Sequence, residues 1–296
     1  MANAYLDSSP IDTQPPKAHT PESTQMRFAS FEINGTPSYG LMDGEQHCRP
    51  APSAFQARFP DLKSVIAAHA LGELAQAALA DSSPVALDQL RLLPVIPNPG
   101  KLICVGLNYK SHVAETKRAD SDYPSLFLRF NDSLAAQGDA VLRPAFSERF
   151  DWEGELAFVI GTGGRYISKE KAFDHIAGYA CFNDVSVRDW QRHTHQFTPG
   201  KNFPGTAPFG PVLVSADEVP DVTTLTLETR LNGQVVQHAS VGDLIFDIPT
   251  IVAYVSRFTP LSPGDVIATG TPGGVGDRRE PPLYMKDGDV VEVEIT

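Results

Sequence analysis

The 296-residue sequence lacks several features that would each point to a definite class of protein. Its three cysteines, Cys48, Cys104 and Cys181, are too few and too scattered for a disulfide framework or a zinc cluster, and we expect ordinary buried side chains. No apolar run reaches the roughly 20 residues of a membrane-spanning helix, and no basic N-terminus precedes an apolar stretch. We therefore expect no membrane association and a cytoplasmic location.

Positive charge is also scarce. The chain carries 24 Lys and Arg against 36 Asp and Glu, a formal net charge of -12. Non-specific nucleic-acid binding requires the opposite balance, so we expect no nucleic-acid partner. The length and the 42% hydrophobic content suit one large domain, alone or with a small one.

The chain divides into three predicted segments. Residues 1–25 are rich in Pro, Ser and Thr and have few apolar groups to offset ordering entropy, which predicts a mobile tail or an arm on a partner subunit. Residues 26–96 are predicted to form a small N-terminal α+β subdomain. A Pro-rich joint over 94–99 marks its boundary with a larger domain over 100–296.

Short strands outnumber helices and do not alternate with them regularly, which excludes a doubly wound α/β fold and predicts an α+β, mostly β, fold. Hydrophobic spacing predicts a helix over 61–80, another after Ser168 as its N-cap, and a third from Asp247. Turn signals and alternation predict strands over 28–33, 36–41, 102–105, 150–160, 179–182, 225–231, 234–237, 266–269 and 290–295.

Two glutamates share one face of the predicted strand over 150–160. Glu153 and Glu155 lie two residues apart, about 7 Å along a strand, and both faces become apolar toward the C-terminal end. Two carboxylates entering a core repel each other and lose hydration, and a divalent cation relieves both costs. Oxygen ligands favour Mg²⁺, Mn²⁺ or Ca²⁺ over zinc. The alternative is a solvated strand end, because so short a motif is common. Asp184, which follows an apolar strand, is either a third ligand or a helix N-cap.

Four motifs, in order, resemble the fumarylacetoacetate hydrolase family. They are DWEGEL from Asp151, NDVSVRDWQ from Asn183, GKNF from Gly200 and PGDVIATGTPGGVG from Pro263. The resemblance covers roughly residues 100–296. It implies a mixed β-roll fold, a homodimer, a small 2-oxo acid substrate, and one divalent cation, Mg²⁺ or Mn²⁺, with Ca²⁺ also possible.

The resemblance also implies roles for single residues. Glu153, Glu155 and Asp184 match the metal ligands, and Lys201 matches the lysine that binds the enolate or carbonyl oxygen. The polar groups Arg188 and Gln191 match residues that line the same site. The segment 108–115 resembles a mobile lid, on which His112 and Glu115 would meet across one helical turn and form a general base for water. A surface His and a surface Glu are the alternative.

The sequence departs from the family pattern in two places. An acidic fourth ligand is replaced by Asn108, so we expect three protein carboxylates and waters. Arg129 stands where many relatives have lysine; it either clamps a substrate carboxylate, which indicates an acidic substrate, or is a surface strand residue. Candidate substrate-binding residues are Tyr109, Arg129, Ser133, Arg188 and Thr271, the last as a hydroxyl donor in a glycine loop over 270–276 that is no P-loop.

We expect hydrolytic C–C cleavage of a 2,4-dioxo acid, an acylpyruvate such as fumarylpyruvate, to pyruvate and a carboxylic acid, in the catabolism of aromatic compounds. The catalytic residues would be His112, Glu115, Lys201 and Gln191. The same metal-stabilised enolate also serves an oxaloacetate-type decarboxylase, or a hydratase or isomerase of 2-hydroxymuconate-like acids. A non-catalytic metal- or ligand-binding protein is the alternative from another class.

Overall fold

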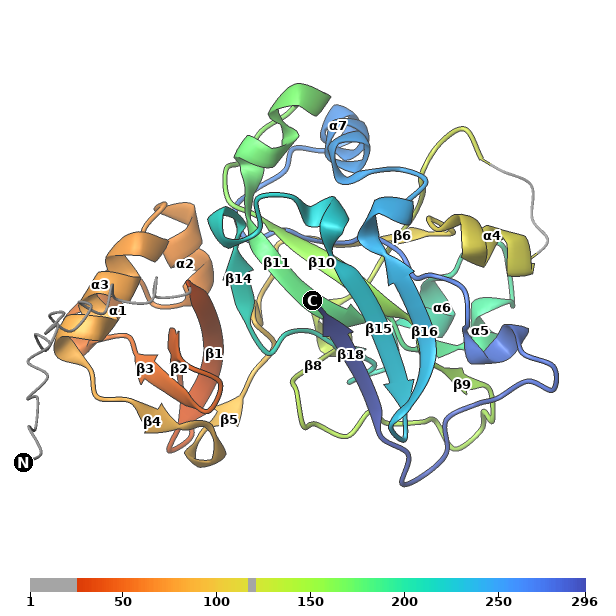
Figure 1. Ribbon diagram of the computed structural model, residues 1–296, viewed down its shortest axis with the longest axis horizontal. Coiled ribbons are helices and arrows are strands. Elements are labelled where there is room, and N and C mark those ends of the chain that lie inside the picture. Colours follow the sequence, from red (N-terminus) through yellow and green to blue (C-terminus); the bar gives the residue numbers. More distant parts are fainter. Residues whose placement is uncertain (1–25, 117–120) are drawn as a thin grey trace, which may run out of the picture.

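The computed structural model describes residues 26–116 and 121–296, and the expectation for residues 1–25 lies outside them. A long mixed sheet runs through the molecule, with a smaller sheet and several helices packed around its C-terminal half (Figure 1). The prediction of an α+β, mostly β, fold is confirmed. Within the described residues no helix is both long and apolar enough to span a bilayer.

The N-terminal part is a strand meander with helices packed against it (Figure 1). The predicted helix over 61–80 is divided, because His69 adopts a φ of +53° and the chain turns there. Asp61 caps the first half in a capping box with Ser64. The elements are β1 (Arg27–Ile33), β2 (Thr36–Asp43), β3 (His47–Pro50), α1 (Ser53–Arg58), α2 (Leu62–Ala67), α3 (Leu71–Asp81), β4 (Val85–Ala86), η1 (Leu87–Gln89) and β5 (Arg91–Leu92).

The main sheet crosses the predicted boundary at 94–99. Strand β1 pairs with β14 (Leu213–Ser215), so strands from both sides of the joint belong to one sheet. The order is β4-β3-β2-β1-β14-β11-β10-β17-β6-β7, with β5 beside β1. The remaining members are β6 (Leu102–Gly106), β7 (Ser125–Leu128), β10 (Gly154–Ile160), β11 (Ile176–Asn183) and β17 (Val266–Ala268).

Strand β10 is the centre of the core, and every residue in it is buried. Its Leu156 and Phe158 pack with helix α7 (Ile248–Phe258), which Asp247 caps as predicted. Its Ala157 and Val159 pack in the cluster on the opposite face. Burial of each large apolar side chain contributes about 1.5–3 kcal/mol, so this strand is a firm support for what it carries at its ends.

Two predictions about local structure are wrong. The predicted strand over 150–160 is broken at Trp152 and Glu153 into β9 (Phe150–Asp151) and β10. Ser168 makes no capping hydrogen bond, and the segment after it is a 3-10 helix, η3 (Lys169–His175). The cysteines are free; Cys181 is only half-buried.

The other elements surround the sheet. A second sheet has the order β16 (Gln234–Ser240), β15 (Thr226–Leu231) and β18 (Val291–Ile295). Shorter pieces are α4 (Lys110–Thr116), η2 (Asn131–Ser133), β8 (Leu134–Ala135), β12 (Ser186–Val187), α5 (Arg188–Gln191), α6 (Thr198–Lys201), β13 (Ala207–Pro208), η4 (Ala216–Glu218), η5 (Val222–Thr224), η6 (Val241–Asp243) and η7 (Gly276–Arg278).

Candidate active site

Adjacent ends of strands β10 and β11 bring the three predicted metal ligands together. Glu153 and Glu155 flank the first residue of β10, and Asp184 follows β11, whose last residue pairs with Gly154. One carboxylate oxygen from each of Glu153, Glu155 and Asp184 lies within 4.8 Å of the other two. All three side chains are buried. The local pattern therefore produces a carboxylate triad on the floor of a cavity.

The glycine between the glutamates is required by packing. A Cβ at Gly154 would lie 2.0 Å from the hydroxyl oxygen of Thr229, closer than real contacts allow. The same tight packing lets Gly154 N donate to the side chain of Gln237 at 2.9 Å. The second sheet thus presses directly on the strand that carries the glutamates.

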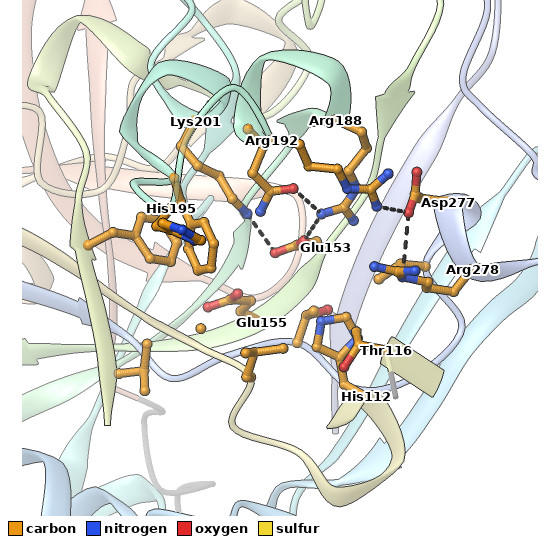
Figure 2. A pocket seen from close by; sticks show the side chains of 18 of the residues that line it. His112, Thr116, Glu153, Glu155, Arg188, Arg192, His195, Lys201, Asp277 and Arg278 are labelled. Atoms are coloured by element: carbon orange, nitrogen blue, oxygen red, sulfur yellow. Dashed lines mark hydrogen bonds and ion pairs between the residues drawn. The ribbon is translucent and has the colours of Figure 1, made fainter. Parts of the chain in front are cut away.

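Two buried cations, Lys201 and Arg188, contact carboxylates of the triad. The ammonium of Lys201 lies 2.7 Å from Glu153 Oε2 and 2.6 Å from Asp184 Oδ2. Arg188 donates to Glu153 through Nη1, and its Nε donates to Asp151 Oδ2 at 2.7 Å. Figure 2 shows Lys201 and Arg188 converging on Glu153 from two sides. These contacts differ among the three carboxylates: Glu153 has two cation partners, and Glu155 has neither Lys201 nor Arg188 in contact.

Burial raises the pKa of Glu155 well above its usual value, and the nearby Asp184 and Glu153 carboxylates raise it further. Burial also tends to raise the pKa of Glu153, but Lys201 and Arg188 outweigh it and hold this pKa far below the ordinary range. Burial tends to lower the pKa of Lys201, but Asp184 and Glu153 reverse the effect and raise it. At neutral pH, Lys201 is therefore a fixed positive charge beside the triad.

The donor set fits a divalent cation. Glu155 accepts a hydrogen bond from Gly270 N at 2.9 Å and otherwise faces two other carboxylates, an arrangement that a hard cation stabilises. Asn108, at the position of the absent fourth ligand, donates to the carbonyls of Phe246 and Thr269 and accepts from Phe246 N. Its amide ties loops together, so the site consists of three carboxylates.

Helix α4 covers the triad and carries the predicted dyad. His112 Nδ1 lies 2.7 Å from Glu115 Oε1, and His112 is buried where it lines the cavity. The helix is docked on the glycine loop, because Gly273 N donates to Ser111 Oγ at 3.1 Å and Gly274 N donates to Glu115 Oε2 at 3.0 Å. The pair is therefore part of the cavity roof, and the alternative of an isolated surface pair is wrong.

Two expected substrate-binding residues are directed elsewhere. Arg129 is buried, so it is no surface residue, and it donates to Asp184, to Thr206 Oγ1 at 2.6 Å and, through Nε, to Ser133 Oγ at 3.2 Å. Ser133 is buried and donates to Phe130 O. Neither lines the cavity. Arg129 therefore neutralises Asp184 from outside the cavity, and Ser133 positions Arg129.

Of the other three expected residues, Arg188 lines the cavity, and Thr271 and Tyr109 differ from the prediction. Thr271 lines the cavity, but its hydroxyl hydrogen is donated to Gly154 O at 2.9 Å, so it is no free donor for a substrate. Tyr109 is buried outside the cavity lining. Burial raises the pKa of its hydroxyl, which has no hydrogen-bond partner among the described residues.

A cavity of about 610 Å³ joins the triad to the dyad. Gln191 lines it as predicted, and its side-chain oxygen accepts from Arg188 Nη1 at 3.0 Å. Sequence reasoning missed other lining residues, because they lie just beyond the ends of the motifs. They are Arg192, His193 and His195 after the DWQ motif, and Asp277 and Arg278 after the glycine loop.

The chain is similar to known proteins over most of its length. Residues 101–296 match the model of the fumarylacetoacetate (FAA) hydrolase C-terminal domain. A mitochondrial oxaloacetate tautomerase of Xenopus laevis is 42% identical over 208 residues, which are 70% of this chain and 65% of that protein.

Solved structures match nearly the whole chain. A fumarylacetoacetate hydrolase of Exiguobacterium antarcticum is 37% identical with a TM-score of 0.79, covering 91% of this chain and 95% of that one. A maleylpyruvate hydrolase of Sphingobium sp. SYK-6, in complex with manganese(II) and pyruvate, is 31% identical with a TM-score of 0.76 and the same coverage. The chain therefore belongs to the fumarylacetoacetate hydrolase family.

Proposed function

We propose that this protein is a divalent-metal-dependent hydrolase that cleaves a C–C bond in a 2,4-dioxo acid, releasing pyruvate and a carboxylic acid. The observation that carries the proposal is a single cavity lined by the triad residues Glu153 and Glu155, by Lys201 and by His112. In such a cavity, a cation, a fixed positive charge and a base can all act on the same substrate molecule. The maleylpyruvate hydrolase with manganese and pyruvate offers independent support.

The cation would be held by Glu153, Glu155 and Asp184, and when bound it supplies positive charge for the carboxylate and 2-oxo oxygens of the substrate. His112 takes a proton from water through Nε2, while the carboxylate of Glu115 holds Nδ1 and stabilises the imidazolium that forms. The hydroxide adds to the C4 carbonyl. Lys201 contributes its charge on the floor, where the enolate develops.

Collapse of this adduct breaks the bond between C3 and C4. The electron pair passes to C3 and is delocalised as the enolate of pyruvate, and C4 leaves as the carboxylic acid. The imidazolium of His112 returns its proton to C3, which restores the neutral base. One water is consumed for each dioxo acid, and the balance requires no further reactant.

Keto–enol tautomerisation of oxaloacetate is a second candidate. The 42% identity to the Xenopus laevis oxaloacetate tautomerase favours it. The same dyad would move a proton to and from C3, and the same floor would stabilise the enolate, but no water would add. The two candidates thus share the triad, Lys201 and the dyad, and they differ in whether water is a reactant.

One experiment separates them. The purified protein is supplied with Mg²⁺ or Mn²⁺ and assayed with acetylpyruvate and fumarylpyruvate for pyruvate release, and with oxaloacetate for decay of enol absorbance. Hydrolysis predicts pyruvate from the dioxo acids that is lost in His112→Ala. Enol decay without pyruvate release from any dioxo acid would establish the second candidate. No turnover in any assay, with metal bound, would make the protein a ligand-binding member of the family.

We also propose a cytoplasmic homodimer acting in the catabolism of aromatic compounds. The oxaloacetate tautomerase of Xenopus laevis, by contrast, is a mitochondrial protein. Light scattering tests the dimer, which should have twice the 32.0 kDa mass of the chain.

A further inference from the structure

Two arginines line the cavity in addition to Arg188, which contacts Glu153. Arg192 follows helix α5, and Arg278 ends η7, 86 positions later in the sequence. Both side chains line the cavity, and in Figure 2 dashed lines join Asp277 to each of them. Because the triad is on the floor of the same cavity, a bound molecule can reach both groups.

Asp277 fixes the two guanidinium groups in place. Arg192 donates to its Oδ2 through Nη2, and Arg278 Nε lies 3.5 Å from the same oxygen. Tyr284 donates to Oδ1 at 2.9 Å, and the backbone nitrogen of Asp277 donates to Asp151 at 3.0 Å. The carboxylate side chain is only 4% exposed, so its position is set by these contacts.

One carboxylate faces two guanidinium groups, which leaves an excess positive charge at this end of the cavity. Burial tends to raise the pKa of Asp277, but its hydrogen bonds with Arg192 and Tyr284 and the charge of Arg188 lower it, so the carboxylate is ionised at neutral pH. The pair can therefore attract a second anion from the cavity.

The two arginines retain unused donors. Their side chains are 40% and 33% exposed; Arg192 donates to Asp277, and Arg278 forms an ion pair with the same carboxylate. Arg129 differs, because it is fully buried and its donors are directed at protein oxygens. Arg279 differs too, because it donates to the carbonyls of Val236 and Gly274. Arg192 and Arg278 therefore combine access to the cavity with free guanidinium N–H groups.

We propose that Arg192 and Arg278 bind a second carboxylate of the substrate, which makes the substrate a dicarboxylic oxo acid. This inference rests on the proposed function, in which the 2-oxo acid group at the other end of the substrate lies at the triad. Guanidinium groups bind carboxylates with short, charge-assisted hydrogen bonds, and two held by one aspartate are already oriented. The site takes over the role that the sequence suggested for Arg129.

The test compares two substrates that differ in this carboxylate. Fumarylpyruvate has a distal carboxylate and acetylpyruvate has a methyl group. Steady-state kinetics is measured for the wild type, Arg192→Gln, Arg278→Gln and the double variant. We expect the KM for fumarylpyruvate to rise at least tenfold more than the KM for acetylpyruvate in each single variant, and further in the double variant. Arg257→Gln is the matched control, since Arg257 is an exposed arginine on α7.

Equal changes for both substrates, with unaltered thermal unfolding, would overturn the proposal while leaving hydrolysis intact. If the wild type hydrolyses neither dioxo acid, the proposed hydrolysis fails, and the arginine site is then decided by binding. Calorimetry of the Mg²⁺-loaded protein with oxaloacetate and with pyruvate measures the preference for two carboxylates. A wild-type preference of at least tenfold that disappears in Arg192→Gln supports the site, and an unchanged preference rejects it.

Discussion

The floor and the rim of the cavity are built on opposite principles. On the floor, Glu153, Glu155 and Asp184 are almost completely buried. Buried cations contact Glu153 and Asp184, whereas Glu155 faces these two carboxylates. On the rim, formed by Arg192, Asp277 and Arg278, the Arg192 side chain is 40% exposed and shares Asp277 with Arg278. The floor is supported by the central strand of the core, whereas the rim is supported by short segments after motifs.

This difference separates two kinds of function. The ion-paired floor residues neutralise one another in a medium of low dielectric constant, so removing one leaves its partner uncompensated and costs folding free energy. Glu155 differs, because the carboxylates of Asp184 and Glu153 repel it. Rim residues keep contact with water, so removing one changes affinity or rate with little cost in stability. The following predictions measure whether that separation holds.

The largest expected effect is at Glu155. The change Glu155→Gln should reduce metal-dependent activity to background because a triad carboxylate is lost. The free energy of unfolding of the metal-free protein should not fall, since the amide removes repulsion with Asp184 and Glu153. Metal titration followed by chemical unfolding in the presence of a chelator measures both quantities.

The pH dependence of metal binding sharpens this prediction. The raised pKa of Glu155 means that the folded metal-free protein binds a proton more tightly than the unfolded chain. That stabilisation is present at low pH and lost as pH rises through the folded-state pKa. A cation displaces the proton, so its affinity should fall as pH falls through the same range. A Glu155→Gln variant that keeps wild-type metal affinity would rule out a three-carboxylate site.

The next largest effect is expected at His112, the proposed general base on the roof of the cavity. His112→Ala should lower kcat for pyruvate release by about 10²- to 10⁴-fold, because the general base is lost, and leave metal affinity unchanged. Glu115→Gln should lower it less, since the ring keeps its place while the charge that stabilises the imidazolium is gone. Retained hydrolysis in His112→Ala would assign the base to another residue.

Arg129 tests the floor by stability alone. Arg129→Met should destabilise the protein by about 3 kcal/mol, because a buried partner of Asp184 is removed and Thr206 and Ser133 lose their donor. Arg257→Met, at an exposed position, should change stability by less than about 0.5 kcal/mol. Urea unfolding of both variants with a chelator present measures the difference. Equal stabilities would mean that Lys201 alone neutralises Asp184.

The pairing of Glu153 with Glu155 and of His112 with Glu115 could be predicted from the sequence because each pair is close in the chain. Asp184 lies about 30 residues further on, and only the family resemblance assigned it to the triad. Arg129 could not be placed, since its partners Asp184 and Thr206 lie 55 and 77 residues away. No periodicity reports which distant carboxylate enters the same part of a core.

The same limit applies to the rim and to parts of the fold. Arg192 and Arg278 come together through the tertiary structure, and each lies just outside a motif. In the fold, hydrophobic spacing predicted one helix over 61–80, but spacing carries little information on the positive φ of His69 that divides it. The pairing of β1 with β14, which joins the N-terminal strands to the main sheet, is also a long-range contact.

The smallest expected effect lies where α4 rests on the glycine loop. Ser111→Ala removes the acceptor for Gly273 N, an exposed hydrogen bond worth about 1 kcal/mol, so kcat/KM should fall by roughly fivefold. The loss should appear in kcat, because α4 carries His112, while metal affinity stays unchanged. Ser38→Ala is the matched control, since the Ser38 hydroxyl has no partner among the described residues. A loss of a hundredfold or more would show that this one contact holds α4 in place, and the roof would then be as intolerant of change as the floor.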